Sequence, residues 1–167
     1  QRRLISVDIA RYLAPEFNSW SGRVRHTLST SSPAGAYAHD RILRELALPR
    51  PRKRMLITAG GLGSGKTTAL GGTTIVAELV FDNQFKDVPR AREILNAALD
   101  HGWLVMVLYV HREFQEIPRA VLERSQRTGR WNSLADLPRM HLDARRAFGE
   151  LRTEYEDRGV FFQGIGN

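Results

Sequence analysis

Apolar residues follow two alternating patterns along the chain from residue 55 onward. Short, nearly continuous apolar runs predict buried strands at residues 55–59, 77–81, 103–110 and 160–162. Between them, apolar residues at helical spacing predict amphipathic helices at residues 88–101, 114 to about 127 and about 138 to 157. Strands that alternate with helices are typical of a parallel sheet with helices on its faces.

The first 54 residues carry a weaker pattern. An apolar piece at residues 4–13 precedes a polar, serine-rich stretch at residues 19–32, and residues 34–48 have apolar positions at helical spacing. Prolines 49 and 51 then end that helix. We therefore expect residues 1–54 to form an N-terminal helical segment that packs on a core of residues 55–167, within one globular domain.

A glycine-rich stretch follows the first predicted strand of the core. Its sequence is Gly60-Gly61-Leu62-Gly63-Ser64-Gly65-Lys66-Thr67, which matches the phosphate-binding pattern of Gly, four residues and Gly-Lys-Thr. Glycines let backbone amides approach phosphate oxygens, and the N-terminus of the following helix attracts the same anion. The motif predicts that ATP is bound by Gly60, Gly61, Gly63, Ser64, Gly65, Lys66, Thr67 and Thr68.

Within this motif, two side chains have their own chemistry. Lys66 adds a full positive charge near the outer phosphates, and the Thr67 hydroxyl can ligate Mg²⁺. The motif and the alternating pattern together predict an α/β fold of the P-loop NTPase or kinase type. We expect a three-layer sandwich with a small, mostly parallel sheet, preceded by N-terminal helices.

Polar residues at the ends of the next two strands are the remaining candidates for substrate chemistry. In an open parallel sheet, ligands bind beyond the carboxyl ends of the strands. Asp82 ends one apolar run and is followed by Asn83, while Arg112 follows another run. Asp82 is predicted to accept a proton from a substrate hydroxyl or to hold Mg²⁺ through water; the structural alternative is a turn cap. Asn83 and Arg112 are predicted to contact substrate.

Two arginines near the end of the helix at residues 114–127 are candidates for transition-state stabilisation. Arg124 shares a helical face with Phe114, Ile117 and Val121, so it must either extend outward or meet a desolvated anion. Arg130 follows the helix stop at Gly129. Beside a phosphate site, both guanidinium groups can neutralise charge that develops during phosphoryl transfer.

The composition of the 167-residue chain limits the remaining possibilities. Its net charge of +7 favours an anionic partner such as a nucleotide, a nucleic acid or an acidic protein. No aromatic platform for stacked bases accompanies the basic residues, so nucleic acid is the less favoured partner. The histidines lack metal-ligand spacing, cysteine is absent, and no apolar run approaches the roughly 20 residues that span a bilayer. We expect a cytoplasmic protein without a membrane partner.

Several pieces of the stretch from residue 59 to 167 together resemble one known family. They are Ala59-Gly60-Gly61-Leu62-Gly63-Ser64-Gly65-Lys66-Thr67-Thr68, Leu79-Val80-Phe81-Asp82, Ala91-Arg92-Glu93-Ile94-Leu95, Leu108-Tyr109-Val110-His111-Arg112, and Val121-Leu122-Glu123-Arg124 followed by Gly129-Arg130. On these pieces the chain resembles the zeta-toxin-like P-loop kinases. The phosphate-binding loop is shared by many families, so the later pieces give the resemblance its specificity.

The resemblance implies an ATP- and Mg²⁺-dependent kinase that acts as a toxin on a small-molecule hydroxyl. In relatives that hydroxyl belongs to the sugar of UDP-N-acetylglucosamine, and some effector relatives phosphorylate NAD. By the same resemblance, Lys66 and Thr67 hold phosphates and Mg²⁺, Asp82 is the base, and Arg124 and Arg130 stabilise the moving phosphoryl group. Such toxins are usually held in check by an antitoxin, which is the protein partner that the resemblance implies.

The chain departs from this family between the loop and Asp82. Only about sixteen residues separate Lys66 from Asp82, and Gly71-Gly72 should cut the intervening helix short. We therefore expect a reduced sheet of roughly four strands. Two alternatives stay open: a kinase for nucleosides or polynucleotide ends, and a nucleotide-binding module without catalytic activity.

Overall fold

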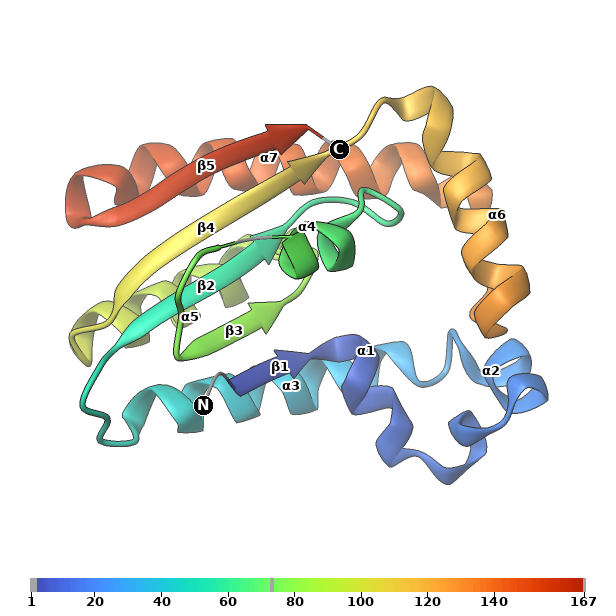
Figure 1. Cartoon of the computed structure of the whole chain (residues 1–167), viewed down its shortest axis with the longest axis horizontal. Helices are drawn as coiled ribbons and strands as arrows, with labels where there is room; N and C mark the ends of the chain where they lie inside the picture. The colour runs from blue at the N-terminus through green and yellow to red at the C-terminus, as the bar shows by residue number, and fades with distance from the viewer. Residues whose placement is uncertain (1–2, 73, 167) are drawn as a thin grey trace.

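The centre of the protein is a five-stranded sheet in which every paired strand is parallel. The computed structural model describes residues 3–72 and 74–166. The strand order is β1-β3-β2-β4-β5 (Figure 1). The strands are β1 (Arg3–Ser6), β2 (Arg54–Ala59), β3 (Leu79–Asp82), β4 (Leu104–His111) and β5 (Val160–Gly166).

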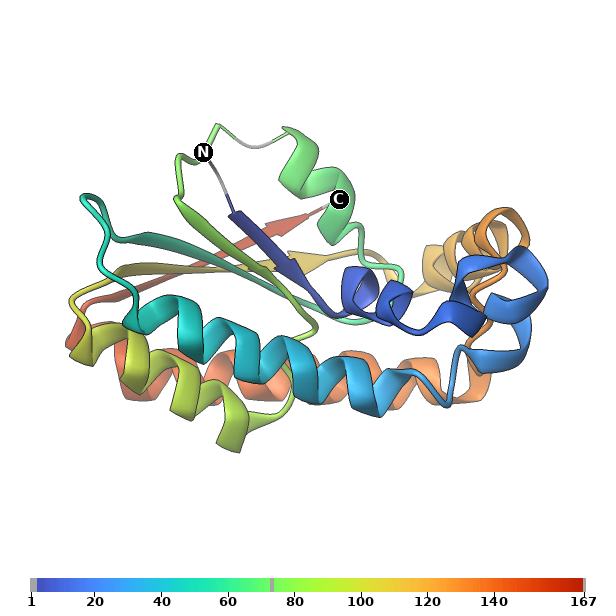
Figure 2. The same cartoon turned by 90° about the horizontal axis from the view of Figure 1, so that it is seen from below.

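Helices cover the two faces of this sheet unequally. Three long helices lie on one face, and they are α3 (Ser31–Ala47), α5 (Val88–Asp100) and α7 (Leu137–Tyr155) (Figure 2). Of the helices within the described residues, only the short α4 (Lys66–Gly72) lies on the other face. Alternation along β2 explains the layers, because Met55 and Ile57 join the core under the three helices while Leu56 joins the smaller core under α4. The α/β class and the parallel sheet are therefore confirmed.

The N-terminal segment differs from its prediction, because its first residues form strand β1. This strand pairs with β3, and Ser6 lies in register with Asp82. The sheet thus has five strands rather than roughly four, and residues before 54 contribute to it. A four-residue strand that begins with Arg3 is too short to show a period of two in the sequence. Short helical pieces follow it: α1 (Val7–Ala10), two 3-10 helices (Arg11–Leu13 and Pro15–Asn18) and α2 (Trp20–His26).

Helical pieces connect β4 to α7, and a further short one connects α7 to β5. A 3-10 helix (Phe114–Glu116) leads into α6 (Ile117–Thr128), which ends at Gly129 in the left-handed conformation, with a φ of 75°. Two further 3-10 helices flank α7, at Leu134–Asp136 and Glu156–Arg158. Among the described residues, no helix has both the length and the apolar character needed to cross a bilayer.

Several arginines form ion pairs near the amino ends of the strands. The buried carboxylate of Glu45 pairs with Arg3, Arg41 and Arg50, which ties α3 to β1 and to the linker that follows the helix. Arg54 forms a two-pronged pair with Glu78, with nitrogen–oxygen distances of 3.0 and 2.6 Å. These arginines stabilise the amino ends of the strands, at the opposite end of the sheet from the phosphate-binding loop.

Candidate active site

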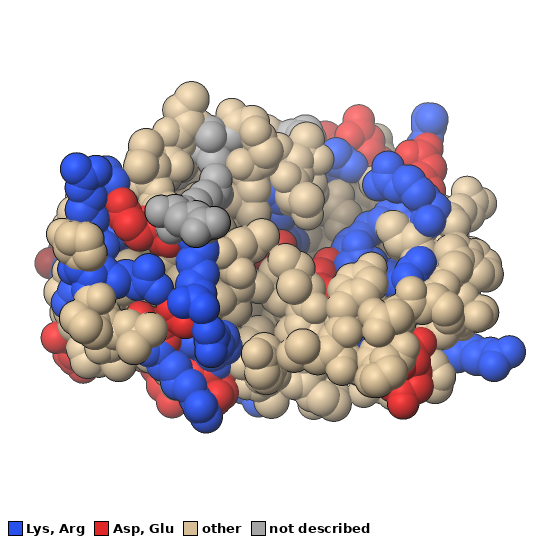
Figure 3. Space-filling view, turned by 60° about the horizontal axis from the view of Figure 1, so that its bottom comes forward, with Lys and Arg blue, Asp and Glu red and all other residues tan. Residues whose placement is uncertain are grey.

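A cavity of about 770 Å³ opens at the carboxyl ends of β1, β2 and β3. The space-filling view shows Lys, Arg and acidic side chains around a hollow on this side of the molecule (Figure 3). Cationic side chains outnumber carboxylates in its lining. The cations are Arg11, Lys66, Lys86, Arg90, Arg112, Arg124, Arg127 and Arg130, and the carboxylates are Asp8, Asp82, Asp87 and Glu123. The cavity is therefore suited to an anionic ligand.

The glycine-rich loop between β2 and α4 lines the cavity with Leu62, Gly63 and Gly65. Gly63 and Gly65 have φ angles of 77° and 94°, a region that favours glycine. Gly60 has a φ of 131°, and a Cβ there would lie 2.5 Å from the carbonyl oxygen of Val110. The loop therefore turns tightly and lies against the backbone of β4.

Lys66 is held within the loop that precedes it. Its ammonium group donates to the carbonyl oxygens of Gly60 and Gly61, at 2.8 and 2.9 Å. Burial lowers the pKa of Lys66 to about 8, although the charges of Asp82 and Asp8 oppose that shift. Burial therefore disfavours the charged form of Lys66, and an anion bound beside it would favour that form again.

Asp82 lies at the end of β3, between two hydroxyl-bearing neighbours in register with it. The Thr58 hydroxyl on β2 donates to Oδ1 at 2.7 Å, and the Ser6 hydroxyl on β1 donates to Oδ2 at 3.4 Å. Parallel strands bring the three side chains to the same edge of the sheet. Both carboxylate oxygens are therefore oriented by the fold beside the loop.

A second carboxylate, Asp8, occupies the same cavity and was not predicted from the sequence. It lies in α1, directly after β1, and its backbone amide donates to the Ser6 hydroxyl at 3.2 Å. Its carboxylate pairs with Arg124 and, at 2.9 Å, with Arg130. Burial alone would raise the pKa of Asp8, but the charges of Arg124, Arg130 and Arg11 outweigh it and lower the pKa.

Arg11 is a second residue that the sequence analysis did not identify. Only 9% of it is exposed, and its Nη2 donates to the Ser31 hydroxyl at the start of α3, at 3.0 Å. Its guanidinium lies 5.8 Å from the ring centroid of Phe17. Its buried Nε has no hydrogen-bond partner among the described residues. Burial lowers the pKa of Arg11, so the side chain lacks part of the compensation that a buried cation needs.

The sequence holds only a weak signal for these two missed residues. Asp82 directly follows the apolar run Leu79-Val80-Phe81, and Asp8 lies three residues after the apolar pair Leu4-Ile5, so in both cases an acid lies at or just beyond the end of a short apolar run. Arg11 lies three residues after Asp8, the spacing that brings side chains onto one face of a helix.

Most of the predicted site residues line this one cavity. They are Gly63, Gly65, Lys66, Thr67, Thr68, Asp82, Asn83, Arg112, Arg124 and Arg130. Gly60, Gly61 and Ser64 belong to the loop but do not line the cavity. The Asn83 side-chain oxygen accepts from the amides of Gln84 and Phe85, at 2.6 and 3.2 Å, so it also orders the loop after β3.

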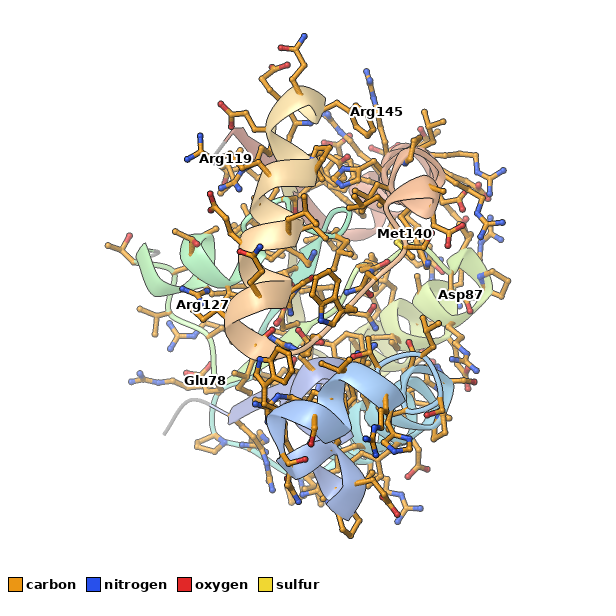
Figure 4. All side chains as sticks on the ribbon, turned by 90° about the vertical axis from the view of Figure 1, so that its right-hand side faces the viewer. Glu78, Asp87, Arg119, Arg127, Met140 and Arg145 are labelled. Carbon is orange, nitrogen blue, oxygen red and sulfur yellow. The ribbon has the colours of Figure 1, made fainter. Side chains whose placement is uncertain are left out.

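Contacts from the N-terminal segment hold α6 beside the cavity. The Trp20 indole donates to the carbonyl oxygen of Gln126 at 3.2 Å, and Arg23 donates to that of Thr128. Figure 4 looks onto α6, with Arg119 and Arg127 on one side of the helix and Met140, in the first turn of α7, on the other. These contacts place Arg124 and Arg130 where they meet Asp8.

No model of a protein family matches the chain, and no curated protein matches it at a significant level.

Proposed function

We propose that the protein is an ATP- and Mg²⁺-dependent phosphotransferase that acts on a hydroxyl group of a small molecule. One observation carries this proposal. The glycine-rich loop with its lysine, the carboxylates of Asp8 and Asp82, and the mostly buried Arg124 and Arg130 line one cavity. Phosphoryl transfer depends mainly on positioning and on electrostatic stabilisation, and these are the groups that it uses.

The loop side of the cavity suits the phosphoryl donor. Loop amides and Lys66 would contact the phosphates of ATP, which supplies the transferable phosphoryl group. Among residues 3–72 and 74–166, no cluster of three or more His, Asp or Glu side chains could hold a metal by itself. Mg²⁺ commonly relies on one or two carboxylates together with phosphates and water. Thr67 and Asp82 fit that requirement, because both line the cavity beside the loop.

The two carboxylates have surroundings that support different roles. Asp82 is oriented by Thr58 and Ser6 beside the loop, which suits the metal side of the site. Asp8 lies after β1, among Arg11, Arg124 and Arg130. We assign to Asp8, rather than to Asp82, the role of base that accepts the proton of the acceptor hydroxyl. Asp82 keeps the second of the two roles expected from the sequence, which is to hold Mg²⁺ through water. Without a nucleotide, Asp8 is the counterion of the arginines that a triphosphate would otherwise attract.

Arg124 and Arg130 suit the charge that develops on the transferred group. Both side chains are mostly buried, with 27% and 15% exposed, so their charges are screened less than surface charges. Released from Asp8, they could donate to the equatorial phosphoryl oxygens. Their position at the end of α6 agrees with the role that the zeta-toxin resemblance implies.

The acceptor side of the cavity suits a molecule that is itself anionic. Arg11, Lys86, Arg90 and Arg112 line it beyond the residues assigned to ATP. UDP-N-acetylglucosamine and NAD, the acceptors of zeta-toxin-like kinases, both carry a diphosphate that meets this requirement. We infer a toxin-type activity in the cytoplasm on such an acceptor, and an inhibitory protein partner that would block the cavity.

The test is a phosphoryl-transfer assay with ATP and Mg²⁺ against nucleotide sugars, NAD, nucleosides and oligonucleotides. Mass spectrometry would reveal the gain of one phosphoryl group on the acceptor. We expect Lys66→Ala, Asp8→Asn and Asp82→Asn each to abolish transfer. Transfer to nucleosides or oligonucleotides alone would favour the second kind of kinase, and ATP binding without any transfer would favour a non-catalytic module.

A further inference from the structure

We propose that His141 of α7 is a positioning residue that holds the phosphate-binding loop in its working conformation. This inference rests on the proposed function, because it concerns the loop assigned to ATP. It goes beyond that function because nothing in the loop motif requires a histidine from a distant helix.

The contact between His141 and the loop is direct. Its Nε2 lies 2.8 Å from the carbonyl oxygen of Leu62. A carbonyl oxygen only accepts hydrogen bonds, so Nε2 must carry the proton. Phe114 packs edge to face against the imidazole, with ring centroids 6.2 Å apart and planes at 85°. The ring is therefore fixed from two sides.

Gly61 supplies an independent observation for the same contact. A Cβ at Gly61 would lie 2.4 Å from Cδ2 and Nε2 of His141 and 2.5 Å from its Cε1. The φ of Gly61 is not positive, so its backbone conformation does not call for glycine. Position 61 is also one of the unspecified positions of the phosphate-binding pattern. The absence of a side chain at Gly61 is explained by the close approach of the imidazole.

The hydrogen bond to Leu62 determines the direction of a loop amide. In a trans peptide the carbonyl of one residue and the N–H of the next point to opposite sides. Because the Leu62 carbonyl is directed toward His141, the Gly63 N–H is directed away from it, and Gly63 lines the cavity. His141 thereby keeps a carbonyl oxygen from facing the phosphates and presents an amide in its place.

The side chain of Leu62 anchors the same peptide to the arginine-bearing helix. Leu62 is buried in a small apolar cluster with Ile117, Val121 and Leu137. The loop at Gly63 also approaches α6 closely, since a Cβ there would lie 2.8 Å from Cγ2 of Val121. His141, α6 and the loop therefore form one packed unit.

The charged groups around His141 favour its neutral form. Burial lowers the pKa of His141, and the charges of Lys66 and His111 act in the same direction, while the hydrogen bond to Leu62 opposes them. A neutral imidazole with its proton on Nε2 can still donate to Leu62, so positioning of the loop does not require a charge on His141.

A double-mutant cycle tests the contact, with MgATP affinity measured by calorimetry. We expect Gly61→Ala alone to weaken MgATP binding by about tenfold or more, because the new methyl displaces the imidazole. In the His141→Ala background, the same Gly61→Ala change should weaken binding less than about twofold further. Equal effects of Gly61→Ala in both backgrounds would overturn the inference.

Two further variants separate the hydrogen bond from packing. His141→Phe keeps a planar ring without the donor, and His141→Gln keeps an N–H donor. We expect MgATP affinity to fall about tenfold in the first variant and about threefold or less in the second. His101→Gln, at an exposed position after α5, is the matched control. Unchanged affinity in His141→Phe would also overturn the inference.

Hydrogen exchange of loop amides without nucleotide distinguishes this inference from the proposed function. We expect faster exchange at residues 60–65 in His141→Phe than in the wild-type protein, and no change in His101→Gln. A wild-type protein that binds no MgATP, yet shows this dependence on His141, would refute the proposed function alone. Unchanged exchange in His141→Phe would refute the positioning role.

Discussion

The Thr58 hydroxyl donates a 2.7 Å hydrogen bond to Oδ1 of Asp82, across the boundary between β2 and β3. The two residues are partners in the strand register, so the bond joins the strand that enters the phosphate-binding loop to the strand that carries the carboxylate. Thr58 therefore orients the Asp82 carboxylate, and Thr58 belongs to β2, the strand that leads into the loop ending at Lys66.

Replacing Thr58 with valine tests what this hydrogen bond contributes. Thr58→Val keeps the branched shape but removes the donor, and we expect about 1 kcal/mol lower stability. We also expect the Mg²⁺ concentration for half-maximal transfer to rise several-fold, because Asp82 would lose its orientation. A Mg²⁺ titration of the transfer rate measures this, with Thr153→Val on the outer face of α7 as control. An unchanged Mg²⁺ requirement would argue against a metal-side role for Asp82.

Asp8→Asn should have opposite effects on binding and on catalysis. The asparagine removes the negative charge that now neutralises Arg124 and Arg130. We expect tighter binding of MgATP or tripolyphosphate, by about threefold to tenfold, because the arginines then lack a competing anion. We expect transfer to be lost, because the base is absent. Calorimetry and the transfer assay measure the two effects, and weaker polyphosphate binding in Asp8→Asn would contradict the proposed exchange of counterions.

The lowered pKa of Lys66 predicts proton uptake when ATP binds. With a pKa of about 8 in the nucleotide-free protein, against 10.5 for an ordinary lysine, roughly half of the Lys66 side chains are neutral at pH 8. Bound phosphates favour the ammonium and raise this pKa, so binding at pH 8 should take up about half a proton. Calorimetry in buffers of different ionisation enthalpy measures the uptake. It should vanish in Lys66→Met and persist in Lys86→Met, whose lysine is exposed at the cavity.

The same shift predicts how stability depends on pH. The folded-state pKa lies below the unfolded one, so the charged side chain costs stability at pH values below about 8. This cost disappears as the pH rises from about 8 toward the ordinary lysine value. Lys66→Met should therefore unfold at a higher temperature than the wild-type protein at pH 7, by a margin that shrinks above pH 8. If the difference in unfolding temperature stayed constant across that pH range, the pKa of Lys66 would not be lowered in the folded protein.

The part of the fold that follows residue 54 was predictable because its signals are long or specific. The strand of residues 103–110 is apolar on both faces and was found within one residue of β4 (Leu104–His111). The helix predicted at residues 88–101 was found as α5 (Val88–Asp100), followed closely by Gly102. The loop motif then located Lys66 and Thr67 in the cavity.

The missed parts depend on contacts between distant segments. Strand β1 forms because it pairs with the edge of β3. Residues 3–6 are too few to predict a strand by themselves. Asp8 becomes a site residue only because Arg124 and Arg130, more than a hundred positions later, are brought to it. His141 likewise acquires a role through its contact with Leu62. Such pairings follow from the tertiary arrangement, which local periodicity does not encode.

The junction of α6 with the N-terminal segment gives a last prediction, on stability. Gly129 adopts a φ of 75°, and a Cβ there would lie 2.6 Å from the carbonyl oxygen of Trp20. Gly129→Ala should therefore destabilise the protein by about 2 kcal/mol, from backbone strain and from the clash together.

The clash should also loosen α6 and its arginines, so transfer should fall more than MgATP binding does. Gly149→Ala is the matched control, because a Cβ at Gly149 meets nothing within 4 Å and the residue lies inside α7. That control should stabilise the protein by about 0.5–1 kcal/mol, because alanine favours a helix interior over glycine. Urea denaturation measures both changes. If Gly129→Ala were as stable as the control, the contact between Trp20 and the end of α6 would not hold that helix in place.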